Sequence, residues 1–269
     1  MAPAPDLDGK TALLTGATGG IGNAIARALH RQGAAVKLSG RRAEVLESLA
    51  GELGDRAEVL PADLSQPDEV ASLAERAGDV DVLVANAALP GSGHLDDYSW
   101  DEVDRALAVN LTAPVKLTHA LLPRMLERGS GHLVYISSIS GKVPAAGSSI
   151  YSATKFALRG FAFSLHEELR AKGVGVTTVF PGFIRGAGMF ADTELELPRG
   201  AGTRTPEQVA DGVLAGIASN RAEIDVAALP QRMGGRLFGA MPRVIAATVR
   251  ATGGEKLADA MADAQRVKR

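Results

Sequence analysis

Short runs of apolar residues alternate along the chain with longer stretches in which apolar side chains recur at helical spacing. The short runs predict buried parallel strands, and the helical stretches, such as the one with Ile21, Ile25 and Leu29, predict crossover helices. The predicted strands are 11–15, 35–39, 58–61, 80–86, 131–137, 174–180 and 223–226. The pattern indicates an α/β fold, a Rossmann-type doubly wound parallel sheet of about seven strands with helices on both faces.

The 269 residues fit one large α/β domain. We predict a catalytic domain over 1–230 that continues into a basic, partly helical extension over 231–269. Between Gly182 and Thr205, five glycines interrupt the alternation and predict a mobile substrate loop at 183–204. The apolar side chains of this loop favour a hydrophobic carbonyl substrate, such as a lipid-like ketone or a sterol; they are Met189, Phe190, Leu195 and Leu197.

The C-terminal extension holds eight Lys and Arg residues against three Asp and Glu residues. One helical face of it carries Leu237, Met241, Val244, Ile245 and Thr248. A face of this kind can lie on an anionic membrane, cover a substrate pocket, or pack against the body or another subunit. Gly234, Gly235 and Pro242 interrupt the helix, so packing is favoured over peripheral membrane contact.

The composition excludes several kinds of chemistry. The chain has no cysteine, so disulfides, thiolate metal sites and cysteine nucleophiles are ruled out. Its five histidines are scattered without ligand spacing, and no metal site is predicted. A net charge of −2 gives no indication of nucleic-acid binding. Neither a signal peptide nor a bilayer-length apolar stretch is evident, so we expect a cytoplasmic location.

A glycine-rich turn follows the first predicted strand and opens the first helix, over 15–22. At this turn the backbone can approach a pyrophosphate closely, and the free N–H groups of the helix N-terminus can bind it. The predicted cofactor contacts of the turn are Gly16, Thr18, Gly19, Gly20, Ile21 and Gly22. A tight turn that needs glycine only for backbone reasons is the alternative interpretation.

The end of the second predicted strand bears on the choice of dinucleotide. NAD-binding folds usually place a carboxylate here to hold the ribose 2′-hydroxyl. This chain instead has Ser39, Arg41 and Arg42, which can bind a 2′-phosphate by charge-assisted hydrogen bonds. NADP(H) is therefore the predicted cofactor, with NAD(H) as the alternative.

Tyr151 and Lys155 lie four residues apart at the start of a predicted helix, so their side chains share one face. A phenol with a pKa of about 10 is a poor acid or base near neutrality, and a nearby ammonium brings its proton transfer into range. Ser138, at the carboxyl end of the fifth predicted strand, could hydrogen-bond a substrate oxygen. Asn110 could hold a water that connects Lys155 to solvent.

Taken together, the motifs resemble those of the short-chain dehydrogenase/reductase family, in its single-domain NADP-type form, over nearly the whole chain. The matching segments are TGATGGIG at 15–22, AD at 62–63, NAA at 86–88, Asn110, Ser138, YSATK at 151–155 and PG at 181–182. The resemblance implies a catalytic tetrad of Asn110, Ser138, Tyr151 and Lys155. It also implies further cofactor contacts at Asp63, Leu64, Asn86, Ala87, Tyr151, Lys155, Pro181, Gly182 and Ile184. Gly186 departs from the family, which often has threonine there.

The resulting hypothesis is an NADP(H)-dependent oxidoreductase that moves a hydride between nicotinamide and a carbonyl or secondary alcohol. The alternatives are an NAD-dependent alcohol or hydroxysteroid-type dehydrogenase and a non-catalytic NADP(H)-binding regulatory module. The resemblance also implies a homodimer or homotetramer formed through the helices that bear Asn110 and Tyr151.

Overall fold

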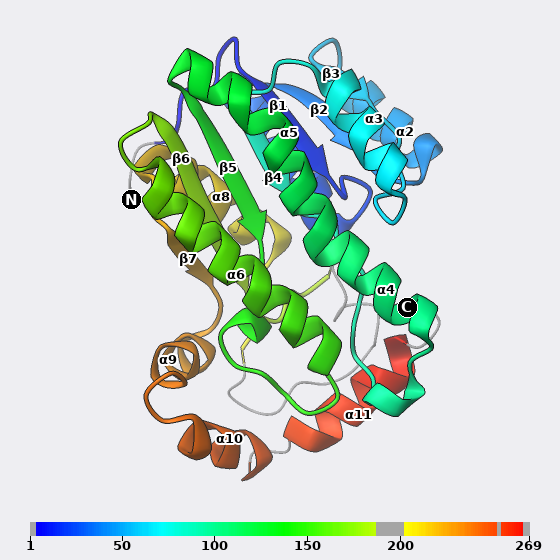
Figure 1. The fold of residues 1–269 in the computed structure, drawn as a ribbon, viewed down its shortest axis with the longest axis vertical. Helices are drawn as coiled ribbons and strands as arrows, with labels where there is room; N and C mark the ends of the chain where they lie inside the picture. The colour runs from blue at the N-terminus through cyan, green and yellow to red at the C-terminus, as the bar shows by residue number, and fades with distance from the viewer. Residues whose placement is uncertain (1–3, 187–201, 252–253, 266–269) are drawn as a thin grey trace.

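The computed structural model describes residues 4–186, 202–251 and 254–265. A seven-stranded, all-parallel sheet in the order β3-β2-β1-β4-β5-β6-β7 forms the centre of the molecule (Figure 1). The strands are β1 Thr11–Thr15, β2 Ala35–Ser39, β3 Ala57–Val59, β4 Val82–Ala85, β5 Gly131–Ile136, β6 Val174–Pro181 and β7 Glu223–Val226. The predicted doubly wound sheet is confirmed, and its strand order reverses between β1 and β4. Ligands of open α/β sheets bind at such a reversal, beyond the carboxyl ends of the strands.

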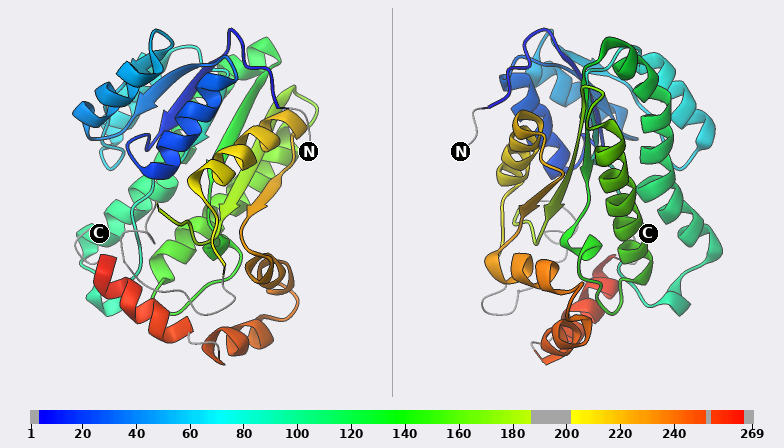
Figure 2. Two further views of the ribbon diagram at one scale, coloured as in Figure 1. Left: turned by 180° about the vertical axis from the view of Figure 1, so that it is seen from behind. Right: turned by 60° about the vertical axis from the view of Figure 1, so that its left-hand side comes forward.

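Helices cover both faces of the sheet (Figure 2). One face carries α1 Gly20–Arg31, α2 Ala43–Leu53 and α8 Pro206–Ser219, and the other carries α3 Pro67–Ala77, α5 Ala113–Arg128 and α6 Ser149–Leu169. Each face has its own apolar core, in which strand side chains of alternate positions meet the buried faces of the helices. The helix α4, Trp100–Leu107, continues through the π-helical segment η2, Ala108–Thr112, into α5.

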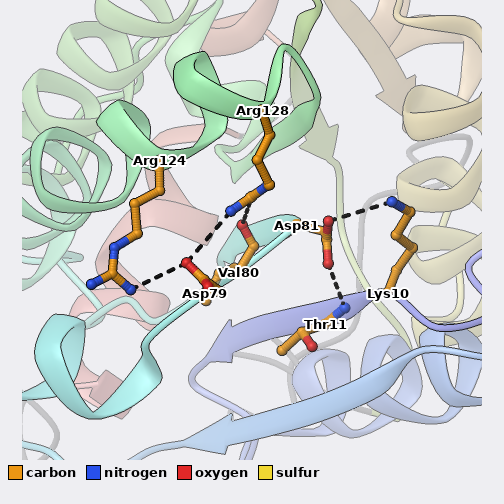
Figure 3. Close-up of polar contacts among 7 residues, drawn as sticks. All are labelled: Lys10, Thr11, Asp79, Val80, Asp81, Arg124 and Arg128. Atoms are coloured by element: carbon orange, nitrogen blue, oxygen red, sulfur yellow. Dashed lines mark hydrogen bonds and ion pairs between the residues drawn. The ribbon is translucent and has the colours of Figure 1, made fainter.

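Ion pairs and hydrogen bonds connect α5, β1 and the segment before β4 at the amino end of the sheet (Figure 3). Arg124 and Arg128 of α5 pair with Asp79, at 3.2 and 3.6 Å, and Arg128 also donates to the Val80 carbonyl at 2.8 Å. Asp81 accepts a hydrogen bond from the Thr11 backbone N–H at 2.9 Å. The strand β4 begins just after these contacts, at Val82 and not at 80 as predicted. They are structural contacts.

A buried histidine in β5 makes the free energy of unfolding depend on pH in the acid range. Burial, together with the nearby charge of His166, lowers the pKa of His132 to about 4. Its Nε2 hydrogen-bonds Thr177 Oγ1 at 3.0 Å. An unfolded chain takes up this proton at about pH 6.5, so the free energy of unfolding falls as the pH drops from 6.5 towards 4.

We expect this effect to cost about 3 kcal/mol of stability at acid pH, from about 1.4 kcal/mol for each unit of pKa difference. Urea unfolding of wild type and His132→Gln at pH 7 and pH 4.5 measures it, because glutamine keeps a donor for Thr177 but does not titrate. The variant should lose markedly less stability than wild type on acidification. Equal losses would assign the acid sensitivity to the carboxylates.

After β7 the chain forms three helices, α9 Leu229–Leu237, α10 Pro242–Ala251 and α11 Gly254–Gln265. They follow one another below the carboxyl ends of the strands, and α11 ends beside α4 (Figures 1 and 2). Leu237, Met241 and Val244 of the predicted apolar face stay exposed, at 42%, 46% and 52%. Among the described residues, no helix combines the length and apolar character needed to cross a membrane.

The predicted mobile loop lies mostly outside the described residues, which omit 187–201 and with them its four apolar side chains. The two ends of the loop are described and pair with each other. Arg185 N–H donates to the Arg204 carbonyl at 2.8 Å, and Arg204 N–H donates to the Phe183 carbonyl at 2.9 Å. The loop therefore starts and finishes at one place on the carboxyl edge of the sheet.

Candidate active site

The turn between β1 and α1 is built so that only glycine fits at two of its positions. Gly16 has φ +68°, and a Cβ there would lie 2.8 Å from the Ala87 Cα. A Cβ on Gly22 would collide with the Gly16 carbonyl. The backbone is thus bare at the N-terminus of α1, where free N–H groups and the helix dipole favour an anion.

A cavity of about 660 Å³ opens in front of this turn, between the carboxyl ends of β1, β2 and β4. Its volume is within the range of cofactor pockets, about 300–1,000 Å³. Thirteen of the predicted cofactor residues line it: Gly16, Thr18, Gly19, Gly20, Ile21, Gly22, Ser39, Arg41, Arg42, Asp63, Leu64, Asn86 and Ala87. The cavity and the glycine turn together fit a dinucleotide.

The β2 end of the cavity combines a buried hydroxyl with two guanidinium groups. Ser39 is 1% exposed, and its Oγ has no hydrogen-bond partner within the described part of the chain. Arg42 donates to the Thr18 carbonyl at 2.8 Å, which ties it to the glycine turn. Arg41 is exposed at the rim. A hydroxyl and two guanidinium groups are the kinds of donor that bind a phosphate.

Asp63, which follows β3, lines the same cavity. Burial by itself would raise the pKa of Asp63, but hydrogen bonds from Ser65 and the charges of Arg41 and Arg105 leave it below its usual value. Ser65 donates to Asp63 Oδ1 from its N–H at 3.0 Å and from its Oγ at 2.9 Å. The carboxylate is therefore held ionised as a hydrogen-bond acceptor at the cavity wall.

Asn86, just after β4, hydrogen-bonds the glycine turn. Its Nδ2 donates to the carbonyls of Thr15 and Gly16, at 3.0 and 3.1 Å. The N–H groups of Asn86 and Ala87 both donate to Thr15 Oγ1 at 3.1 Å. The Asn86 side chain thus fixes the glycine turn to β4.

Tyr151, near the start of α6, and Ser138, just after β5, come together at the carboxyl edge. Burial raises the pKa of Tyr151 to about 12, and a hydrogen bond with Ser138 acts in the opposite direction. Ser138 Oγ also accepts from the Ser140 N–H at 3.1 Å, which orients it at the start of the short helix η3, Ile139–Gly141. A protonated phenol and a hydroxyl therefore face the same space.

Lys155 lies one helical turn after Tyr151 and is 2% exposed. Its Nζ donates to the Ile136 carbonyl at 2.9 Å and lies 5.5 Å from the centre of the Tyr151 ring. Burial lowers the pKa of Lys155 to about 8. Its ammonium is thus close enough to act on the charge of the phenol, and its charge is lost at mildly alkaline pH.

Asn110 lies in the π-helical segment η2 and is 1% exposed. Its side chain accepts from the Leu89 N–H at 2.7 Å, and its Nδ2 donates to the Leu89 carbonyl at 3.1 Å and to Thr154 Oγ1 at 3.5 Å. The side chain is therefore committed to the loop after β4. Any water held for Lys155 would need another group of this segment, such as a main-chain carbonyl that the π-helix leaves free.

Comparison with known proteins agrees with this geometry. The family model of the short chain dehydrogenases matches residues 10–197. The chain belongs to this family. The nodulation protein G of Rhizobium meliloti (strain 1021) is 43% identical to this chain over 189 residues, 68% of this chain and 76% of the relative. The ketoacyl reductase HetN of Nostoc sp. (strain PCC 7120 / SAG 25.82 / UTEX 2576) is 37% identical over 227 residues, 82% of this chain and 79% of the relative.

A solved structure extends the likeness to three dimensions. The short-chain dehydrogenase from Sphingobium yanoikuyae, in complex with NADPH, superposes with a TM-score of 0.75 at 30% identity. The match covers 87% of this chain and 96% of that structure. The short-chain dehydrogenase fold is therefore shared almost throughout.

The remaining predicted residues of this short-chain dehydrogenase lie outside the cavity lining. Pro181 ends β6, Ile184 is buried, and Gly182 donates its N–H to the Val226 carbonyl at 3.0 Å. Gly186, with φ +73°, does line the cavity. The bare backbone of Gly186 is therefore what this position presents to a cofactor.

Three residues that the motifs did not indicate also belong to the site. A Cβ on Gly91 would lie 2.7 Å from Tyr151 Cβ, so this glycine lets the loop after β4 pack directly on the tyrosine. Arg105 of α4 and Gln265 of α11 line the cofactor cavity. Arg105 lies one helical turn before Val109, and this spacing could have indicated that Arg105 lines the cavity. Nothing in the sequence indicates that Gln265 returns to the first half of the chain.

Proposed function

We propose that this short-chain dehydrogenase is an NADP(H)-dependent oxidoreductase that interconverts a carbonyl compound and a secondary alcohol. The observation that supports this most directly is the juxtaposition of Tyr151 and Ser138, backed by the buried Lys155, beside a dinucleotide-sized cavity with a bare glycine turn. When bound, the dinucleotide supplies the hydride for the carbonyl carbon.

The protein's own residues handle the oxygen and the proton. Tyr151 stays protonated at neutral pH because burial raises its pKa to about 12, so its Oη can donate a proton to the carbonyl oxygen. Ser138 Oγ positions the same oxygen and stabilises the charge that develops on it. The Lys155 ammonium stabilises the phenolate left on Tyr151.

The test is oxidation of NADPH, and of NADH in parallel, by the purified protein with a panel of aldehydes, ketones and β-ketoacyl thioesters. The thioesters belong in the panel because one relative is named as a ketoacyl reductase. Turnover with NADPH supports the proposal and begins to define the substrate. Tight NADPH binding without turnover on any member of the panel would favour a non-catalytic binding module.

The Ser39, Arg41 and Arg42 cluster makes a separate prediction about cofactor choice. We expect Arg41→Gln/Arg42→Gln to weaken NADPH binding by about 10- to 100-fold, because hydrogen bonds to charged groups contribute about 1.5–3 kcal/mol. NADH binding should change by less than about threefold. Fluorescence titration with each dinucleotide measures both, and Arg31→Gln, exposed at the end of α1, is the matched control. Equal weakening of both dinucleotides would contradict the NADP(H) assignment.

A further inference from the structure

The exposed apolar side chains of the molecule are concentrated on α9, α10 and the turn between them. These two helices project from the body beyond β7 (Figures 1 and 2). In the described part of the chain, eleven large apolar side chains are exposed, and five of them lie within 229–244: Leu229, Met233, Leu237, Met241 and Val244. Single exposed apolar residues are normal, but a group of them marks a surface that binds something apolar.

The side of α9 that packs on the body carries a glycine and an amide. Gly235 is buried, and a Cβ there would lie 3.2 Å from Ile139 Cδ1 and 3.3 Å from Lys142 Cβ. Gln231, one turn earlier on this side of the helix, donates from Nε2 to the Gly202 carbonyl at 3.3 Å. The packed side of α9 therefore buries no large apolar side chain of this helix.

The apolar side of α9 faces away from the body. Leu229, Met233 and Leu237 recur every four residues and form one stripe. With 3.6 residues per turn, this stripe lies on the side of the helix opposite Gly235. A helix on the surface of a globular protein usually buries its apolar stripe against the core. In α9 the stripe is instead turned outward, 42–63% exposed.

The same helices are cationic. Residues 229–251 include four arginines and no Asp or Glu: Arg232, Arg236, Arg243 and Arg250. The last three of these are exposed. An outward apolar stripe flanked by arginines, without carboxylates, is typical of helices that lie in the interface of an anionic bilayer.

The arginines of α9 also border a cavity of about 330 Å³ beside the edge strand β7. Its charged lining is Lys142, Arg159, Arg221, Glu223, Asp225, Arg232 and Arg236. Both carboxylates are already paired, since Lys142 Nζ lies 2.9 Å from Glu223 and 2.6 Å from Asp225. Arg232 Nε, by contrast, is buried without a hydrogen-bond partner among the described residues. The excess of positive charge favours a phosphate group here.

We propose that α9 and α10 bind the surface of an anionic phospholipid bilayer, with the apolar residues of 229–244 at the acyl boundary and the arginines on lipid phosphates. A second copy of this chain is the competing occupant. A symmetric contact through this surface would bring the arginines of both copies together, which like-charge repulsion disfavours. The inference is independent of the proposed function, because membrane binding needs neither cofactor nor substrate.

Co-sedimentation of the full chain with vesicles tests the inference directly. The protein should pellet with vesicles of phosphatidylcholine and phosphatidylglycerol in equal parts, and stay in solution with vesicles of phosphatidylcholine alone. Binding should weaken as salt is added, because salt screens the attraction between the arginines and the lipid phosphates. Equal binding to both kinds of vesicle, or binding to neither, would overturn the inference.

The apolar stripe is tested by Met233→Gln/Leu237→Gln. Binding to the anionic vesicles should weaken by about 10- to 100-fold, because two apolar side chains no longer leave water on binding. Val45→Gln, at an exposed apolar position of α2, is the matched control and should bind as wild type does. Sedimentation velocity without lipid should give the same assembly size for the double variant and wild type. A smaller assembly in the variant would assign the stripe to a contact between copies and overturn the inference.

The cations are tested by Arg236→Gln/Arg243→Gln. Binding to the anionic vesicles should weaken by about 10- to 30-fold, from about fivefold for each arginine near the surface. Arg31→Gln, at an exposed position of α1, is the matched control and should leave binding unchanged. If the control weakens binding as much as the double variant does, net charge and not this surface is responsible, and the inference is wrong.

Discussion

Replacing Tyr151 with phenylalanine should reduce kcat for carbonyl reduction by about 1,000- to 10,000-fold. General acid catalysis by a positioned side chain contributes about 100- to 10,000-fold, and Tyr151 is also a hydrogen-bond donor to the substrate oxygen. The Ser138 hydroxyl remains in the variant, but an aliphatic hydroxyl is a much weaker acid than a phenol and does not replace Tyr151 as the proton donor. The measurement is single-turnover oxidation of bound NADPH with the best carbonyl of the panel.

Tyr135→Phe is the matched control for this prediction. Tyr135 is buried, and its hydroxyl hydrogen-bonds Thr118 Oγ1 at 2.6 Å within the core. Its loss should lower the free energy of unfolding by about 1 kcal/mol and leave kcat close to wild type. NADPH affinity should be the same in both variants, because neither residue lines the cavity. Full activity in Tyr151→Phe would rule out this tyrosine as the acid.

The features predictable from sequence were those set by local pattern. Strands 11–15, 35–39 and 223–226 have the bounds that were predicted from the sequence. The glycine turn was predictable because its backbone demands are local, and Gly16 indeed has a positive φ. The pairing of Tyr151 with Lys155 follows from helical spacing, since both lie on α6.

The features that could not be predicted depend on contacts between distant segments. The Asn110 side chain binds the backbone of Leu89, 21 residues earlier, which its spacing from the other site residues did not indicate. Gly91 is a packing site only because α6 brings Tyr151 against it. Gln265 reaches the cavity only because three helices carry it below the sheet. No spacing in the sequence encodes these approaches.

Replacing Lys155 with methionine should lower kcat/KM for reduction by about 100- to 1,000-fold. The charge of Lys155 stabilises the phenolate that forms when Tyr151 gives up its proton, and methionine fills a similar volume without charge. Lys116→Met, an exposed lysine on α5, is the control and should have wild-type activity. A fluorescence titration with NADPH shows whether the variant still binds the cofactor, so that a loss of chemistry is separated from a loss of binding.

The pH profile gives this prediction its sharpest form. Because burial lowers the pKa of Lys155 to about 8, its ammonium is present below that pH and is lost above it. Reduction by wild type should therefore fall as the pH rises through about 8, while Tyr151, whose pKa is raised to about 12, remains protonated. The pH dependence of kcat/KM reports the pKa values of groups in the free enzyme. The decline should therefore be absent from Lys155→Met. The low kcat/KM of this variant should stay constant between about pH 7 and 9. An unchanged decline in the variant would assign the titration to another group and remove Lys155 from the proposed role.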